Sequence, residues 1–279
     1  MSLVKNHICE VRKIVKEWKA QGLTIGVVPT MGALHKGHAS LMKKARELCD
    51  KVIVTVFVNP TQFGPNEDYD KYPRTLESDK KLCEGENVDL IFAPAPLEMY
   101  PEENFTKVVP PEVFQNKLCG KSRPVHFNGV ALVVTKLFNI TQADYGFFGL
   151  KDAQQFFIIK KFVRDLNIPI EIIGCPIIRE DDGLAVSSRN IYLDEDARLK
   201  APCLSRILSY IKKSYDEGER DFDKIKAKSL ELLEEGIEIE YLESIDTETF
   251  EQVSALKENT LVALAAKIAG VRLIDNVIF

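Results

Sequence analysis

The chain has 279 residues, of which 45% are hydrophobic and 28% charged, a composition typical of a globular protein with a substantial core. Its net charge of −5 argues against nucleic-acid binding, which usually comes with a basic excess. No apolar run approaches the ~20 residues of a membrane helix, and residues 1–19 lack the apolar block of a secretion signal, so we expect a cytoplasmic protein without membrane partners.

The N-terminal part alternates between helix and strand patterns. Apolar residues at helical spacing predict an amphipathic helix over residues 3–20, and a short strand then ends at Pro29. A turn follows, then a helix over 39–49 and an apolar strand over 52–58. A strand–loop–helix–strand unit of this size is expected to pair its strands in parallel, through a right-handed crossover.

The alternation continues to about residue 177. The predicted helices cover 74–87, 130–142 and 152–167, and the predicted strands cover 88–95, 106–111, 143–149 and 168–177. Regular alternation of this kind predicts an α/β fold, a Rossmann-like doubly wound parallel sheet.

The composition changes after residue 177. A polar, turn-rich segment leads into charged helical stretches over 197–235 and then into strand-like segments over 236–246 and 260–279. We therefore expect two domains: 1–177, the Rossmann-like domain, and 178–279, a smaller C-terminal α+β domain. The loop at this boundary is where a mobile lid would lie.

The six cysteines are at least 28 positions apart, so no C-x-x-C metal or redox pair exists. In a reducing compartment we expect them to be free thiols.

In the segment "PTMGALHKGH", His35 and His38 lie in the turn between the predicted strand that ends at Pro29 and the helix that follows. Residues three apart in a first helical turn face the same way, and a helix N-terminus attracts anions, phosphates above all. Gly32 and Gly37 carry no Cβ, which lets a ligand approach the backbone closely. In an open α/β sheet, this turn lies at the strand end where ligands usually bind. We interpret the turn as a phosphate-binding site.

Other readings of this turn are weaker. A zinc site needs a third close ligand, and neither the cysteines nor His7 and His126 are placed by sequence to supply one. The Walker A spacing of Gly32 and Gly37 is followed by His38-Ala39 instead of Lys-Ser/Thr, and no dinucleotide fingerprint is present. Two ordinary surface histidines would be the expectation for a lone H-x-x-H, but the preceding strand, the glycines and the following helix favour phosphate.

Four further segments carry polar groups at strand ends or turns. "FVNPTQF" offers the amides of Asn59 and Gln62, and "GFFGLKDAQQ" offers Lys151 and Asp152 at a helix start. "DGLAVSSRN" offers hydroxyls and an arginine that could clamp a phosphate, although a serine-rich linker is the plainer interpretation. In "KSRPVHFNGV", Arg123 could bind a carboxylate.

Together with "YPRT" and the closing "RLIDN", these motifs closely resemble the pantothenate synthetase (pantoate–β-alanine ligase) family, in the same order and over essentially the whole chain. The family belongs to the nucleotidyltransferases that share an H-x-G-H motif with some aminoacyl-tRNA synthetases. The resemblance implies that ATP and (R)-pantoate form pantoyl adenylate and pyrophosphate, and that β-alanine then attacks the acyl carbon to give pantothenate and AMP. It also implies Mg²⁺, carried mainly on the phosphates, and a homodimer.

The resemblance also implies roles for individual residues. The implied catalytic residues are His38, the proton donor, with His35, Lys151, Ser187, Ser188 and Arg189. The implied ATP-binding residues are Pro29, Thr30, Met31, Gly32, His35, Gly37, His38, Gly149, Lys151, Asp152, Ile178, Val186, Ser187, Ser188 and Arg189. The implied pantoate and β-alanine residues are Gln62, Gln155, Met31, Asn59 and Arg123. Asp79 is a further candidate carboxylate contact, and no protein ligand for the metal is implied.

The chain departs from the family pattern at Leu150, where Glu is frequent, and at Val125, where Gly is frequent. Neither position is assigned to the chemistry. Two rival functions stay open at this point. A nucleotidyltransferase of the same fold could use a phosphorylated acceptor, and a regulatory module could bind ATP without turnover.

Overall fold

The computed structural model describes residues 2–65, 67 and 69–279. Contacts divide the chain into two compact units. The first contains residues 1–111, 123–150 and 155–176, and the second contains 112–122, 151–154 and 177–279. The last division falls between residues 176 and 177, and the two short segments 112–122 and 151–154 also belong to the second unit.

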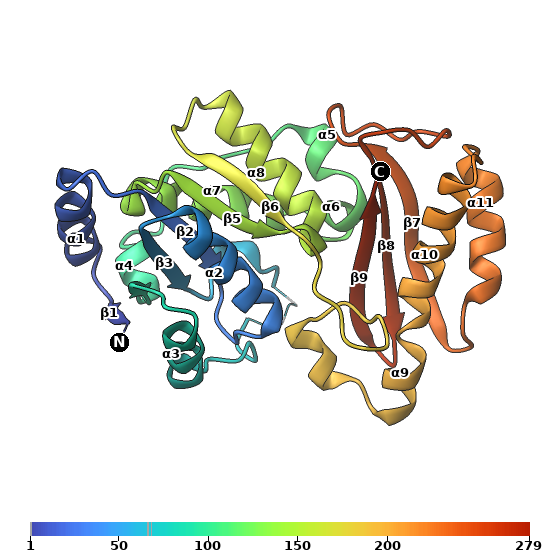
Figure 1. Cartoon of the computed structure of the whole chain (residues 1–279), viewed down its shortest axis with the longest axis horizontal. Coiled ribbons are helices and arrows are strands. Elements are labelled where there is room, and N and C mark those ends of the chain that lie inside the picture. Colours follow the sequence, from blue (N-terminus) through green and yellow to red (C-terminus); the bar gives the residue numbers. More distant parts are fainter. Residues whose placement is uncertain (1, 66, 68) are drawn as a thin grey trace. The chain divides into compact units, whose positions relative to one another are not determined.

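The first unit is built on a six-stranded sheet with the order β1-β4-β3-β2-β5-β6, and all its pairings are parallel (Figure 1). Its strands are β1 (Leu3–Lys5), β2 (Ile25–Thr30), β3 (Lys51–Val56), β4 (Leu90–Phe92), β5 (Tyr145–Gly149) and β6 (Glu171–Cys175). Its longer helices are α1 (Ile8–Ala20), α2 (Lys36–Leu48), α3 (Leu76–Gly85), α7 (His126–Thr141) and α8 (Ala153–Asp165), with short turns α4 (Pro96–Met99) and η1 (Pro60–Gln62).

The sheet is covered on both faces, which is why its strands are apolar throughout. In β2 the neighbouring residues Val27 and Val28 point to opposite faces, and both are fully buried. The apolar stripe of α2, formed by Leu41, Met42 and Ala45, packs with Val28 in one core cluster. The predicted doubly wound fold is thus confirmed.

Two predicted elements of this unit were wrong. Residues 3–20 are not one helix, because Leu3–Lys5 form a strand beside β4 and α1 begins only at Ile8. The Ile8 N–H is held by the Glu98 carboxylate, 2.8 Å away, which sets the helix start. Residues 106–111 form no strand, since Pro110 and Pro111 supply no N–H to a sheet ladder.

The second unit contains a three-stranded antiparallel sheet, β7 (Ile237–Asp246), β8 (Thr260–Ile268) and β9 (Val271–Ile278), in that order. Its other elements are α5 (Glu112–Gln115), α6 (Leu118–Ser122), η2 (Leu150–Asp152), η3 (Ser188–Tyr192), α9 (Glu195–Lys200), α10 (Cys203–Asp216), α11 (Phe222–Ser229) and η4 (Leu230–Leu232). The apolar face of α10 packs with strand residues such as Leu264 in one core cluster, which confirms the predicted α+β class.

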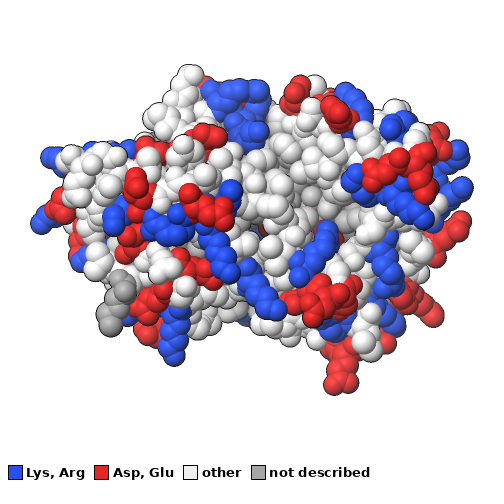
Figure 2. All heavy atoms as spheres, in the orientation of Figure 1, with Lys and Arg blue, Asp and Glu red and all other residues white. Residues whose placement is uncertain are grey.

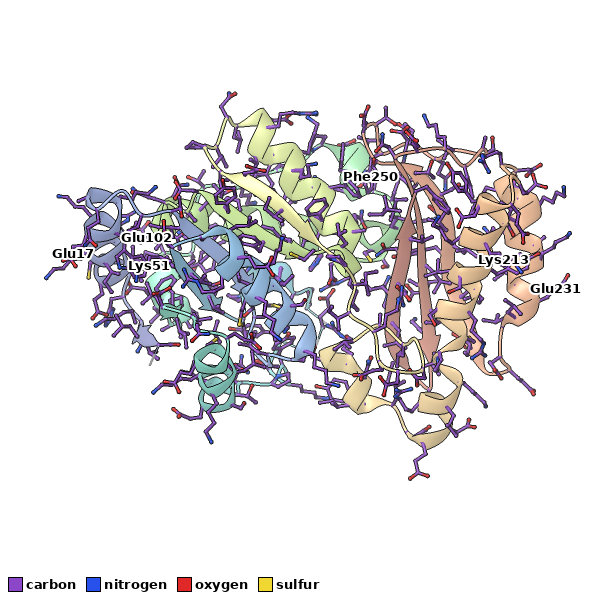
Figure 3. All side chains as sticks on the ribbon, in the orientation of Figure 1. Glu17, Lys51, Glu102, Lys213, Glu231 and Phe250 are labelled. Atoms are coloured by element: carbon purple, nitrogen blue, oxygen red, sulfur yellow. The ribbon has the colours of Figure 1, made fainter. Side chains whose placement is uncertain are left out.

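The segments 112–122 and 151–154 are tied into this unit by specific contacts. Phe114 stacks on Phe250, labelled in Figure 3, with ring centroids 4.6 Å apart. The Lys117 ammonium donates to the Phe250 carbonyl at 2.8 Å, and the buried Gln154 amide donates to the carbonyls of Phe114 and Lys117. These bonds explain why two short pieces that precede residue 177 in the sequence belong to the second unit.

All six cysteines are free thiols, as the sequence predicts. Among the described residues, no helix is both long enough and apolar enough to cross a membrane.

Candidate active site

His35 and His38 cap the start of α2 together. The Nδ1 atom of His35 accepts from the Gly37 N–H at 3.1 Å, and the Nδ1 atom of His38 accepts from the His35 N–H at 3.2 Å. Their ring centroids lie 4.1 Å apart. Because each Nδ1 accepts a hydrogen bond, the neutral rings carry their hydrogens on Nε2, so each histidine is an Nε2–H donor.

The turn that leads into α2 is strained and is held by Asp79 of α3. Gly32 and Ala33 both have positive φ, 84° and 49°. The buried Asp79 carboxylate accepts from the Ala33 N–H at 3.2 Å, the Leu34 N–H at 2.8 Å and the Thr75 hydroxyl at 3.2 Å. A Cβ on Gly32 would lie 3.0 Å from this carboxylate. Asp79 therefore positions the turn, a role that the sequence pattern did not reveal.

Asn59 and Gln62 stand beyond the carboxyl end of β3, next to β2. The Gln62 amide oxygen accepts from Asn59 at 3.0 Å, and its nitrogen donates to the Met31 sulfur at 3.1 Å. The structure thus brings together Met31, Asn59 and Gln62 from two neighbouring strand ends, as parallel pairing requires.

The Asn59 amide is occupied by protein partners. Its nitrogen donates to Gln62 and to the Gly129 carbonyl, and its oxygen accepts from the Thr61 hydroxyl and the Tyr100 hydroxyl. A side-chain amide has two donor hydrogens, and both are used here. This geometry favours a positioning role for Asn59 over the direct substrate contact that the sequence suggested.

Arg123 and His126 hold the backbone of Gln62. His126 Nδ1 donates to the Gln62 carbonyl at 2.9 Å, while its Nε2 accepts from Arg123 at 3.2 Å. The Arg123 Nε atom donates to the Glu67 carboxylate at 2.8 Å. Burial opposes ionisation of Glu67, but the Arg123 guanidinium outweighs it and lowers the pKa of Glu67. The carboxylate partner of Arg123 in this structure is therefore Glu67.

A cavity of about 300 Å³ lies beside the strained turn, at the carboxyl ends of β3 and β4. Met31, Gly32 and Asp79 line one part of it, and Tyr69 and Pro94 line another. A hollow of this size suits a small organic molecule.

The remaining predicted residues of the first unit stand at two places. Gly149 ends β5, and Gln155 lies in the first turn of α8. Pro29 and Thr30 end β2, where the Thr30 hydroxyl donates to the Thr55 carbonyl at 2.6 Å and accepts from the Gly32 N–H at 3.1 Å.

The second unit carries the other predicted residues on two local structures. Lys151 and Asp152 lie in η2. Ile178 and Val186 face each other across a hairpin, closed by the bond from the Val186 N–H to the Ile178 carbonyl at 2.9 Å.

The serine-rich segment continues directly from this hairpin. Ser187 caps η3 by accepting from the Arg189 N–H at 3.3 Å, so Ser188 and Arg189 form the first turn of η3. This segment is therefore a hairpin followed by a capped turn.

The described residues include no group of three or more His, Cys, Asp or Glu that could hold a metal ion. The Asp79 carboxylate, which faces the strained turn, already accepts three hydrogen bonds.

The chain is similar to known proteins over almost its whole length, and this similarity identifies its family. The family model described as pantoate-beta-alanine ligase matches residues 3–278. The chain belongs to the pantoate–β-alanine ligase family. As a member of this family, it is an enzyme of the ligase class.

Relatives and solved structures agree with this membership. The chain is 50% identical to the pantothenate synthetase of Caldicellulosiruptor saccharolyticus (99% of both chains covered) and 52% identical to that of Ruminiclostridium cellulolyticum (98% of both). It is similar to the crystal structure of pantothenate synthetase from Thermus thermophilus, with a TM-score of 0.92, 39% identity, and coverage of 99% of this chain and 98% of that one.

A second structural neighbour contains ligands. It is the pantoate-beta-alanine ligase of Francisella tularensis, complexed with beta-gamma ATP and beta-alanine. The TM-score is 0.79 and the identity 36%, with coverage of 100% of this chain and 98% of that one.

Proposed function

We propose that the chain condenses (R)-pantoate with β-alanine to form pantothenate, through a pantoyl-adenylate intermediate and with release of AMP and pyrophosphate. One observation carries the proposal. Two Nε2–H donors at the N-terminus of α2 stand beside a Met31–Gln62 pair at the end of the adjacent strand. These groups support the proposal because they suit a phosphate and, next to it, an uncharged polar substrate.

In the first step, a pantoate carboxylate oxygen forms a bond to the α-phosphorus of ATP, and pyrophosphate leaves with the electron pair of the broken P–O bond. The negative charge that moves onto the phosphate oxygens is stabilised by the His35 and His38 donors and by the positive end of α2. His38 is the proposed proton donor. Such a transfer needs orientation and cationic support more than a covalent nucleophile.

In the second step, the β-alanine amine attacks the acyl carbon. It loses a proton as the C–N bond forms, and the acyl–oxygen bond breaks to release AMP. Gln62 is the proposed contact for pantoate and β-alanine, and Gln155 the second contact for pantoate. Asn59 supports Gln62 through the amide–amide bond described above, and Arg123 supports it by donating to the Gln62 carbonyl at 3.5 Å.

The residues of the second unit are proposed to bind the nucleotide. Lys151, Ser187, Ser188 and Arg189 would contact the phosphates, Asp152 and Gly149 of β5 the ribose, and Ile178 and Val186 the adenine. We place the C-terminal residues 178–279 in the role of a lid over the nucleotide. ATP would enter as its Mg²⁺ complex, and the enzyme would act as a cytoplasmic homodimer.

Pyrophosphate release from Mg·ATP and pantoate, measured with and without β-alanine, tests the proposal. We expect a single turnover without β-alanine and steady turnover with it. Release that does not require pantoate would favour another acceptor, and ATP binding without release would favour a regulatory module.

The role of His38 is tested by His38→Asn. Asparagine can still accept from the His35 N–H but removes the Nε2–H donor, so pyrophosphate release should fall at least about 100-fold. The exposed His7→Asn is the matched control and should match the parent. Equal rates in His38→Asn and the parent would exclude this role.

A further inference from the structure

The "RLIDN" motif occupies residues 272–276 of β9, and no step described above uses it. Its last two residues, Asp275 and Asn276, are buried, with only 4% and 5% of their surfaces exposed. Neighbouring residues of a strand point to opposite faces of a sheet, so the two side chains serve different surroundings. Burying two consecutive polar side chains costs free energy unless each finds a partner.

Asp275 holds the hairpin that leads into the serine-rich segment. Its carboxylate accepts two hydrogen bonds from the Arg179 guanidinium, at 2.6 and 3.0 Å, in the bidentate geometry that fixes both groups. Arg179 also donates to the Gly183 carbonyl at 3.0 Å, at the tip of the hairpin. Val186 lies at the end of this hairpin, and Ser187 follows directly.

Asn276 holds the peptide of Lys151. Its side-chain nitrogen donates to the Lys151 carbonyl at 2.9 Å, and its backbone N–H donates to the Asp275 carboxylate at 2.8 Å. The contact spans 125 positions in the sequence. This contact fixes the backbone position of Lys151. The bond from the Asn276 N–H to Asp275 links this contact to the one between Asp275 and Arg179.

We infer that Asp275 and Asn276 form a positioning pair that sets two phosphate-binding segments, Lys151 and the Ser187–Arg189 turn, in one fixed relation. The inference rests on the proposed function, because it assigns the pair to the adenylation step. Neither side chain needs to touch a substrate. A strand needed only for folding could carry apolar residues here, as β9 does at Leu273 and Val277.

The Asn276 contact is tested by a double-mutant cycle with Lys151. Asn276→Ala should lower the rate constant of pyrophosphate release about 10- to 100-fold, with the KM for pantoate within about twofold of the parent's. In a Lys151→Ala background, the same change should cost less than about twofold, because Asn276 acts through Lys151. Full multiplication of the two losses would overturn the inference.

Two further variants separate positioning from folding. Asn276→Asp keeps the shape of the side chain but replaces the donor with an acceptor. Its rate constant of pyrophosphate release should therefore fall by the same factor as in Asn276→Ala. Arg272→Lys is the matched control on the same face of β9, where Arg272 bonds to Glu240 and not to Lys151. It should keep the parent's rate. An equal loss in Arg272→Lys would show that any damage to β9 suffices, which would overturn the inference.

Asp275→Asn tests the contact between Asp275 and Arg179. It should lower adenylation about 10-fold or more, and an Arg189→Ala background should mask most of this loss. A rate of adenylation in Asp275→Asn equal to the parent's would overturn the positioning role of Asp275.

Hydrogen–deuterium exchange provides a readout that does not depend on turnover. Exchange should accelerate in residues 150–154 for Asn276→Ala and in residues 178–189 for Asp275→Asn, while α10 stays protected. Unchanged exchange in both segments would overturn the inference. If the parent itself produced no pyrophosphate, the proposed function would fail, and the exchange result would still decide whether the pair holds the two segments.

Discussion

The Asp79 carboxylate accepts three hydrogen bonds, two of them from the strained turn before the paired histidines. Removing the Asp79 carboxylate leaves these buried donors without an acceptor, which typically costs about 1–3 kcal/mol of stability. We therefore expect Asp79→Ala to destabilise the chain by this amount and to slow pyrophosphate release, with Asp79→Asn in between. Urea unfolding and steady-state kinetics measure both effects. The exposed neighbour Glu77→Ala is the control, and a parental rate in Asp79→Ala would contradict the role of Asp79.

Gly37 leaves room for the His35 ring. A Cβ at this position would lie 2.9 Å from His35 Cε1, so the ring must move. We expect Gly37→Ala to reduce pyrophosphate release about 10-fold or more while leaving the fold intact. Gly85→Ala, in another helix and with no atom near the added Cβ, should match the parent in rate. Identical kinetics for both variants would show that the position of the His35 ring does not matter.

At the scale of elements, α7 packs directly against η1. A Cβ on Gly129 would lie 2.3 Å from the Thr61 carbonyl oxygen and 2.5 Å from the Gln62 nitrogen. No side chain fits this gap without moving η1, and with it Gln62.

Gly129→Ala should therefore destabilise the chain by about 1–3 kcal/mol, as overpacking usually does, and raise the KM for pantoate. Thermal unfolding and pantoate titration check the two effects. Asn139→Ala, at an exposed position of the same helix, is the control. If Gly129→Ala lowered stability but left the KM unchanged, η1 would not position the substrate.

Local patterns predicted most of the elements but not their long-range contacts. The strand–turn–helix around His35 and His38 is readable because apolar spacing and glycines lie within a few residues of each other. Leu3–Lys5 escaped prediction because three residues carry no period of their own, and only pairing with β4 makes them a strand. The pairing of Arg123 with Glu67 could not be predicted from the sequence, because the two residues are 56 positions apart.

The same limit applies to the positions that support the candidate site. Asp79 reaches Ala33 across 46 positions, and Asn276 reaches Lys151 across 125. Such side-chain-to-backbone bonds depend on the finished fold, and no periodicity in the sequence encodes them. The sequence therefore indicated the family and the fold, and its roles for individual site residues stay predictions. The structure added the long-range contacts that hold those residues in place.

For the whole molecule, acidic and basic side chains intermingle on the face shown in Figure 2, in keeping with the small net charge. Asp246, at the end of β7, is one carboxylate with a specific role. The Thr249 N–H, together with the Lys257 ammonium, lowers the pKa of Asp246 to about 2, below its ordinary value of 3.8.

A lowered pKa in the folded state means that Asp246 stabilises the fold above about pH 4 and loses this contribution as the pH falls from 4 to 2. Asp246→Asn should therefore be less stable than the parent by about 1 kcal/mol at pH 7, and this difference should shrink toward pH 2. Urea unfolding across this range measures it. A difference that stays constant with pH would contradict the assignment.

The formation of pantoyl adenylate is tested most directly by isotope transfer. Pantoate labelled with ¹⁸O in its carboxylate is incubated with Mg·ATP and β-alanine, and the AMP is analysed by mass spectrometry. A control with unlabelled pantoate in H₂¹⁸O shows whether water supplies the oxygen. If the carboxylate attacks the α-phosphorus, each AMP carries one ¹⁸O from pantoate. Pantothenate formed together with unlabelled AMP would contradict the adenylate mechanism.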